Sequence, residues 1–296
     1  MSSIDTLLKA AEYVERRESG MRDKWQDLPD ELVLKIFSYS EVIDLISCGQ
    51  VSKRTRNISR DSSLWLTANL QDKIVKTELL ELILIKGCKI LSISNSTIVG
   101  CLSSNINSNL KVLNLSQSTW GLPKVIGLAK PIYRLKNIDV LEQLLFSCSS
   151  LQQLEIDGFC ITSKMAASIC KNGKTLQTLN LKHSYLEDHM DGTLANKNLQ
   201  EIIKCCQELK EVDLAYVNDE DKGITDNDFE YLAKNISPNV EKLNLNSSYI
   251  PPEYDDHVRI LLRRCNKIKA LSLEPLFITD YSLMNIRQRL HLPLKN

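Results

Sequence analysis

The sequence has no long hydrophobic run and no excess of one charge. No apolar run approaches the roughly 18 residues that a membrane-spanning helix needs. Lysine plus arginine equals aspartate plus glutamate at 37 each, so net charge gives no general attraction to nucleic acid or to an anionic membrane. Residues 1–20 have no basic start and are interrupted by charges, unlike a secretory signal. We therefore expect no nucleic-acid partner and no membrane partner.

The cysteines and histidines lack the spacing of a metal site. The chain has nine cysteines, an odd number that is typical of reduced thiols in the cytosol or nucleus, and no two of them stand two to four residues apart. The four histidines are scattered without ligand spacing: His183, His189, His257 and His291. We predict no metal, no cofactor, and a cytoplasmic or nuclear location.

Motifs of catalysis are also missing. There is no Gly-rich phosphate loop, no G-x-S-x-G elbow and no H-E-x-x-H pair. A lone cysteine with a distant histidine could act as a nucleophile that carries ubiquitin as a thioester. Each cysteine has an equally good explanation as a small buried hydrophobe, so we expect a non-catalytic protein, with an enzyme as the weaker alternative.

The stretch from Asp23 to Trp65 predicts three short helices. Pro29 suits the first position of a helix, and Asp30 and Glu31 favour its positive end. Apolar residues then recur at helical spacing: Leu28, Leu32, Ile36 and Phe37. Ser40 is the expected N-cap of a second helix over 42–46, and a third segment covers 50–54. So small a unit buries little surface, and we expect it to complete its core on another protein.

After Trp65 the chain repeats a strand pattern, with apolar residues at the first, fourth and sixth positions of seven segments. These are Cys88-Leu91-Ile93, Leu110-Leu113-Leu115, Leu151-Leu154-Ile156, Leu176-Leu179-Leu181, Leu209-Val212-Leu214, Val240-Leu243-Leu245 and Ile268-Leu271-Leu273. Helical stretches lie between them, over 140–148, 164–170, 229–236 and 257–265. Strand then helix, repeated about seven times, predicts an α/β leucine-rich-repeat solenoid with a concave parallel sheet and helices outside.

Alternation along each strand predicts which side chains face the concave side. The middle row is Ser92, Asn114, Glu155, Asn180, Asp213, Asn244 and Ser272. This row offers hydrogen-bonding and acidic groups, and neither it nor the flanking rows contain arginine. It is a candidate substrate-binding surface, and the alternative is a solvated strand face.

Several segments fall outside the regular pattern. Residues 4–17 predict an amphipathic helix that packs on the neighbouring module or holds a separate partner. Trp120 is either a core residue or an exposed aromatic anchor. Residues 124–137 and the acidic segment 218–223 are insertions that serve either as plain loops or as variable binding elements.

The N-terminal landmarks, taken together, resemble an F-box. They are the sequence Leu28-Pro29-Asp30-Glu31-Leu32, the pairs Ile36-Phe37 and Asp44-Leu45, the basic pair Lys53-Arg54 after Val51, and Leu64-Trp65. The chain departs from the family pattern at Thr55, where F-boxes commonly carry tryptophan. An upstream tryptophan, Trp25, matches one found in some members of the family.

An F-box followed by leucine-rich repeats resembles the substrate receptors of SCF ubiquitin ligases. The resemblance implies residues 1–22 as a helix and linker, 23–67 as the F-box and 68–296 as the repeats. The F-box would bind the SCF adaptor, and through it a cullin-RING ligase, with Trp25, Leu28, Pro29, Leu32, Ile36, Phe37, Leu45, Val51 and Trp65. The repeats would hold a protein substrate for ubiquitination and proteasomal degradation, in a hetero-complex that contains one copy of the chain.

Two other functions are consistent with the same residues. The chain could be a leucine-rich-repeat interaction or inhibitor protein whose N-terminal helices only cap the solenoid. It could also be an F-box protein that binds the adaptor but works outside a ligase. Adaptor binding distinguishes the first alternative from a receptor, and cullin association distinguishes the second.

Overall fold

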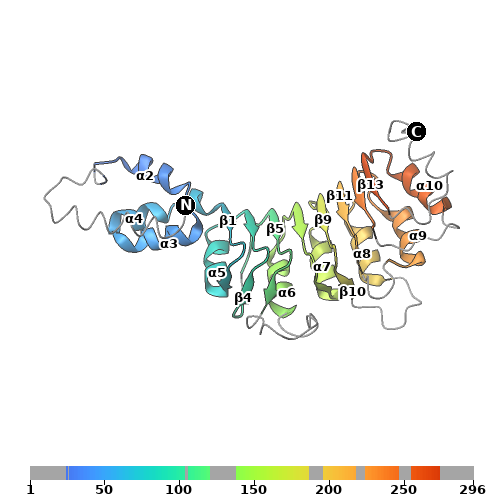
Figure 1. The fold of residues 1–296 in the computed structure, drawn as a ribbon, viewed down its shortest axis with the longest axis horizontal. Coiled ribbons are helices and arrows are strands. Elements are labelled where there is room, and N and C mark those ends of the chain that lie inside the picture. The colour runs from blue at the N-terminus through green and yellow to red at the C-terminus, as the bar shows by residue number, and fades with distance from the viewer. Residues whose placement is uncertain are drawn as a thin grey trace. The chain divides into compact units, whose positions relative to one another are not determined.

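A computed structural model describes residues 25, 27–103, 106–120, 138–186, 196–217, 224–246 and 255–273. The chain forms two compact units, Met1–Asn69 and Leu70–Asn296. Nine α-helices and a parallel sheet among the described residues make the fold mixed α/β (Figure 1). The helix expected over 4–17 and the insertions 124–137 and 218–223 lie outside the described residues.

The N-terminal unit contains the three expected short helices. In order, its elements are α2 (Asp30–Phe37), α3 (Val42–Val51), α4 (Lys53–Ser59), the 3₁₀-helix η1 (Ser62–Trp65) and β1 (Thr67–Asn69). The prediction of Ser40 as N-cap was wrong, because α3 is preceded by Glu41 and begins without a side-chain cap. The buried apolar residues of these helices are Val33, Phe37, Val42, Leu45 and Ile58.

The second unit alternates strands and helices along the chain. Its described elements are β2 (Ile74–Lys76), α5 (Thr77–Ile85), β3 (Ile90–Ser92), β4 (Thr97–Val99), β5 (Val112–Asn114), β6 (Thr119–Trp120), α6 (Ile138–Ser147), β7 (Gln153–Glu155), β8 (Cys160–Ile161), α7 (Ser163–Lys171), β9 (Thr178–Asn180), β10 (Tyr185–Leu186), α8 (Lys197–Cys205), β11 (Glu211–Asp213), α9 (Asp226–Asn235), β12 (Lys242–Asn244), α10 (Asp255–Arg264) and β13 (Ala270–Ser272). Within this unit the helices lie along one side of the strands (Figure 1).

The strands pair in the order in which they occur in the chain. Strands β3, β5, β7, β9, β11, β12 and β13 are parallel neighbours in one sheet, and they coincide with the seven predicted strand segments. Two smaller parallel sheets, β2-β4-β6 and β8-β10, were not predicted. Their strands have two or three residues each.

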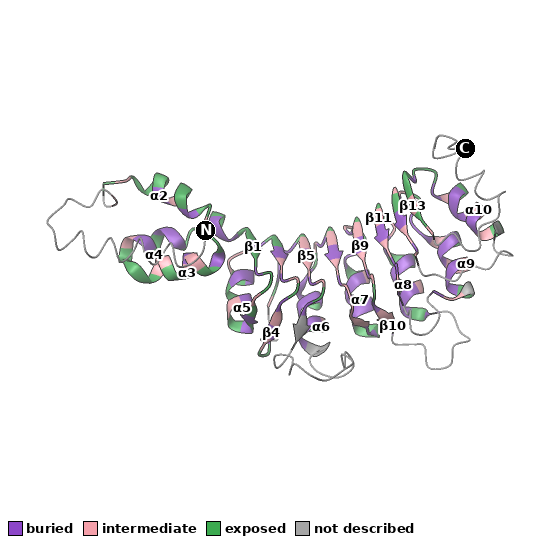
Figure 2. Cartoon of the chain, in the orientation of Figure 1, coloured by how far each residue is buried: buried purple, intermediate pink, exposed green. Residues whose placement is uncertain are grey.

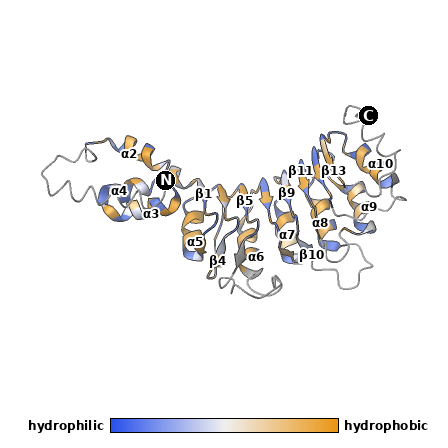
Figure 3. Ribbon diagram, in the orientation of Figure 1, coloured by the Kyte–Doolittle hydropathy of each residue, from blue (hydrophilic) through white to orange (hydrophobic). Residues whose placement is uncertain are grey.

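The core of the second unit is a stack of equivalent apolar residues. Leu110, Leu113 and Leu115 of one repeat have no exposed surface. Leu113 is in register with Leu91 on one side and Leu154 on the other, so each strand places its central leucine over that of its neighbour. Buried residues occupy the strands and the strand-facing side of the helices (Figure 2). Helix α5 was not predicted because it is apolar over most of its length and shows little periodicity (Figure 3).

A left-handed residue follows the strands of the main sheet at a fixed distance. Positive φ angles occur three residues after the strand ends, at Asn95, Gln117, Gly158, His183 and Tyr216. The amide of each donates to a carbonyl in the next repeat, as from Gly158 to Lys182 at 3.0 Å and from His183 to Ala215 at 3.0 Å. The turn therefore satisfies a main-chain donor between repeats, at the cost of a backbone conformation that non-glycine residues disfavour.

Replacing Gly158 with alanine tests this turn. Its φ is 82°, and an added Cβ would have no atom within 4 Å, so backbone strain is the main effect. We expect Gly158→Ala to lower the free energy of unfolding by about 1 kcal/mol in urea denaturation followed by circular dichroism. The matched control is Gly158→Asn, because Asn95 adopts the same conformation at the equivalent position with a φ of 54°. Equal losses for both variants would contradict the explanation.

Candidate functional site

The N-terminal unit exposes apolar side chains on its helices. Leu32 and Ile36 on α2 are 50% and 44% exposed, and Val51 at the end of α3 is 66% exposed. Leu32 and Ile36 lie one helical turn apart and share a face, while Val33 and Phe37 form the buried face of the same helix. Helix α2 is therefore apolar on two faces, and one of them is exposed to solvent.

The structure divides the nine residues that the F-box resemblance assigned to adaptor binding into three groups. Pro29, Leu32, Ile36 and Val51 are exposed, and Trp25 and Leu28 are half-buried. Phe37, Leu45 and Trp65 are buried, with exposures of 3%, 1% and 4%.

Phe37, Leu45 and Trp65 pack inside the unit, and their assignment to adaptor contact stays a prediction. Trp65 donates its indole N–H to the carbonyl of Ser59 at 2.8 Å, and the ring of Phe37 lies 6.5 Å from that of Trp25. Tyr39 and Ile43 are also exposed, although neither belongs to the motif.

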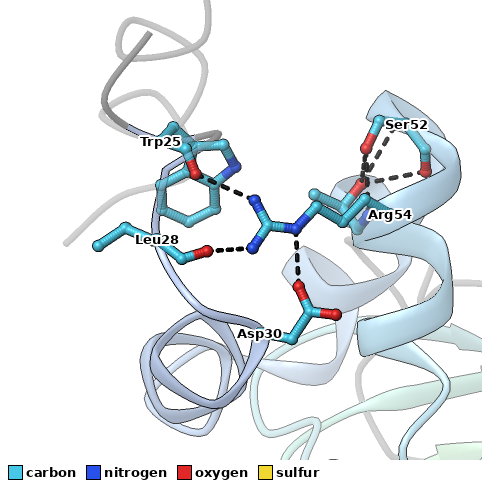
Figure 4. A network of polar contacts seen from close by, with 6 residues as sticks. Trp25, Leu28, Asp30, Ser52 and Arg54 are labelled. Carbon is cyan, nitrogen blue, oxygen red and sulfur yellow. Dashed lines mark hydrogen bonds and ion pairs between the residues drawn. The ribbon is translucent and has the colours of Figure 1, made fainter.

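Arg54 joins the start of α4 to the segment that precedes α2 (Figure 4). Its Nε donates to Oδ1 of Asp30 at 2.7 Å, and its Nη1 donates to the carbonyl of Trp25 at 3.2 Å. Its Nη2 donates to the carbonyl of Leu28. The ion pair with Asp30 is largely solvent-exposed, so its charge attraction contributes only about 0–1 kcal/mol. The fixed fork of the guanidinium instead sets the position of three groups at once.

Thr55 departs from the family pattern and has a structural role of its own. Its hydroxyl accepts a hydrogen bond from the amide of Ser52 at 3.1 Å, and the Ser52 hydroxyl accepts one from the amide of Thr55 at 3.1 Å. This reciprocal capping box satisfies two amides at the start of α4. Thr55 is buried at 6% exposure, so the position where F-boxes commonly carry tryptophan remains part of the core here.

The second candidate surface is the face of the main sheet away from the helices. The predicted middle row lies in continuous register: Ser92, Asn114, Glu155, Asn180, Asp213, Asn244 and Ser272. All seven are partly or fully exposed, whereas the residues before the first six of them in the strands are buried. The structure therefore brings these candidate substrate-binding residues together in one row.

Part of this row is engaged in closing the turns. The side-chain oxygen of Asn114 accepts from the amide of Ser116 at 2.9 Å, and that of Asn180 accepts from the amide of Lys182 at 2.9 Å. Asp213 makes the same contact with the amide of Ala215 at 3.0 Å. These side chains thus fix the strand ends while their remaining polar atoms face solvent or the neighbouring strand.

The cysteines that precede three of the repeats are core residues. Cys148, Cys206 and Cys265 are buried, and the Cys148 thiol donates to the carbonyl of Leu144 at 3.2 Å. Burial raises the pKa of Cys206 to about 12 and that of Cys265 to about 11. A thiol with so high a pKa is a poor source of nucleophilic thiolate at neutral pH.

The described residues contain no group of three or more histidine, cysteine, aspartate or glutamate side chains that could hold a metal ion. None of their helices is both long and apolar enough to cross a membrane.

Comparison with known families identifies residues 25–71 as an F-box-like domain. The match includes α2, α3, α4 and η1, and therefore the exposed apolar surface and the Arg54 contacts. F-box domains bind the SCF adaptor and so link to cullin-RING ligases, and F-box proteins are generally non-catalytic subunits. The domain suggests an adaptor-binding role for this chain.

Removing the Thr55 hydroxyl tests the capping box. We expect Thr55→Ala to lower the free energy of unfolding by about 1 kcal/mol, because the Ser52 amide at the start of α4 loses the hydroxyl that accepts its hydrogen bond. Urea denaturation of the full chain measures this loss. The control is Asn57→Ala, an exposed site in the same helix that should be neutral or slightly stabilising. A loss as large in the control would show that the cap is not the cause.

Proposed function

We propose that this protein is the substrate-recognition subunit of an SCF-type cullin-RING ubiquitin ligase. The observation that carries the proposal is the exposed apolar face of α2, formed by Leu32 and Ile36, inside the F-box-like domain. Val51, Tyr39 and Ile43 add exposed apolar area in the same small unit. A surface of this kind in a soluble domain marks a protein interaction site.

Energetics support the adaptor as the partner of this surface. Complete burial of a leucine or isoleucine side chain contributes about 1.5–3 kcal/mol, and Leu32 and Ile36 have roughly half of that area still in water. Phe37 and Val33 hold α2 from its other side, so the exposed side chains are presented by a rigid helix. Pro29 begins that helix, and the Arg54 contacts fix the segment before it.

The second unit has the features of a leucine-rich-repeat domain, and we propose that it binds the substrate. Parallel three-residue strands, stacked leucines and outer helices support this assignment. The exposed middle row from Ser92 to Ser272 would contact the substrate. The receptor performs no chemistry: it raises the local concentration of a substrate lysine beside a charged conjugating enzyme. The nine free cysteines support a cytoplasmic or nuclear location.

Adaptor binding tests this function. We expect the full-length protein to co-elute with the SCF adaptor in size-exclusion chromatography. Leu32→Asp together with Ile36→Asp should weaken binding by at least about tenfold in calorimetry, because two carboxylates would be buried without partners. The matched control is Ile85→Asp, an apolar residue of the second unit that is 74% exposed, which should leave the affinity unchanged.

Other results would exclude the proposal. Failure of the wild-type protein to bind the adaptor would favour a leucine-rich-repeat interaction or inhibitor protein. Adaptor binding without cullin in affinity-purified complexes would favour an F-box protein that works outside a ligase.

A further inference from the structure

Carboxylates outnumber cations on the strand face of the second unit. Two flanking rows lie two residues before and two residues after the middle row. The described residues of these three rows include four carboxylates and two cations: Glu155, Asp157, Glu211 and Asp213, against Lys182 and Lys242. Lys242 pairs with Glu211 at 2.8 Å. Apart from this pair, the described residues of the three rows contain three carboxylates and the single cation Lys182. The carboxylates are Glu155 on β7, Asp157 after β7 and Asp213 on β11.

Neutral groups hold two of these carboxylates in place. The two carboxylate oxygens of Glu155 accept hydrogen bonds from the side-chain amides of Asn114 and Gln153, at 2.7 and 2.6 Å. Asp213 accepts from the amide of Ala215 at 3.0 Å and from the side chain of Asn244 at 3.2 Å. Such donors orient a carboxylate without cancelling its charge, so the negative potential remains available to a partner.

An aromatic pair lies at the ends of the same strands. The rings of His183 and Tyr216 stack with centroids 4.9 Å apart and an interplanar angle of 19°. Lys182 places its Nζ 5.9 Å from the centroid of Tyr216. His183 follows β9 and Tyr216 follows β11, so both rings belong to the turns after the strands that carry or neighbour these carboxylates.

We infer that the face formed by β7, β9 and β11 binds an extended substrate segment through an arginine side chain. A guanidinium suits this face better than an ammonium, because it pairs with carboxylates through two parallel N–H groups and stacks on aromatic rings. An acidic or phosphorylated segment would be repelled by the three carboxylates. This inference rests on the proposed role of the second unit in substrate binding.

Selection from a peptide library tests the inference. A phage-displayed random dodecapeptide library is selected on the immobilised full-length protein. We expect enrichment of arginine in the bound peptides. Synthetic peptides from the selection are then measured by fluorescence anisotropy, and replacement of their arginine by lysine should weaken binding.

Charge variants assign the binding to this face. Asp213→Asn keeps an acceptor for the Ala215 amide and removes the charge. Asp157→Asn removes the charge of a residue in the turn after β7. Each substitution should lower the affinity for arginine-containing peptides by about tenfold, which corresponds to the loss of a hydrogen bond to a charged group. Lys182→Glu should tighten binding. The control Glu208→Gln changes an exposed carboxylate outside the three rows and should have no effect.

Several results would overturn the inference: a library that yields no binder, selected peptides without arginine, or equal affinity for wild type and the Asp157→Asn, Asp213→Asn double variant. Adaptor co-elution is measured on the same proteins. Loss of adaptor binding with arginine selection intact contradicts the ligase function alone. Adaptor binding without arginine selection contradicts the strand-face inference alone.

Discussion

Hydrogen bonds between successive strands determine the spacing of everything else in the second unit. Each strand of the main sheet has three residues, so its main-chain groups find their partners in the neighbouring repeats. The left-handed turns extend this ladder by one more bond, as from His183 to Ala215. No repeat can satisfy its backbone or bury its leucines alone, and the unit is stable only as an array. Regular rows of outward-facing side chains are the consequence.

The N-terminal unit is organised by a different constraint, which is its small size. Three helices of seven to ten residues cannot bury all their apolar side chains. The interior takes Phe37, Leu45 and Thr55, and the contacts of Arg54 and Ser52 fix the ends of the helices. What remains outside, chiefly Leu32 and Ile36, is therefore exposed on a well-defined helix. A partner that covers this surface would complete the core.

The strands and the middle row could be predicted from the sequence, because side chains alternate between the two faces of a strand. Once a leucine such as Leu113 is assigned to the core, its neighbour Asn114 must lie on the opposite face. Burial could not be predicted where a helix is apolar on two faces. In α2, periodicity does not distinguish Phe37, which is buried, from Ile36, which is exposed. The left-handed turns were not predicted, since Gln117 and Tyr216 are not residue types that favour positive φ. Their conformation comes from the register of the array.

The two surfaces suit the two kinds of contact that a substrate receptor needs. An apolar face on a rigid helix supports a stable attachment, because its affinity comes from buried area. A polar row with oriented, uncompensated carboxylates contributes selectivity and association rate more than raw affinity. A receptor in a ligase must keep its adaptor while it exchanges one substrate for the next. The proposed function therefore assigns stable attachment to the apolar face of the F-box-like domain and substrate exchange to the polar strand face.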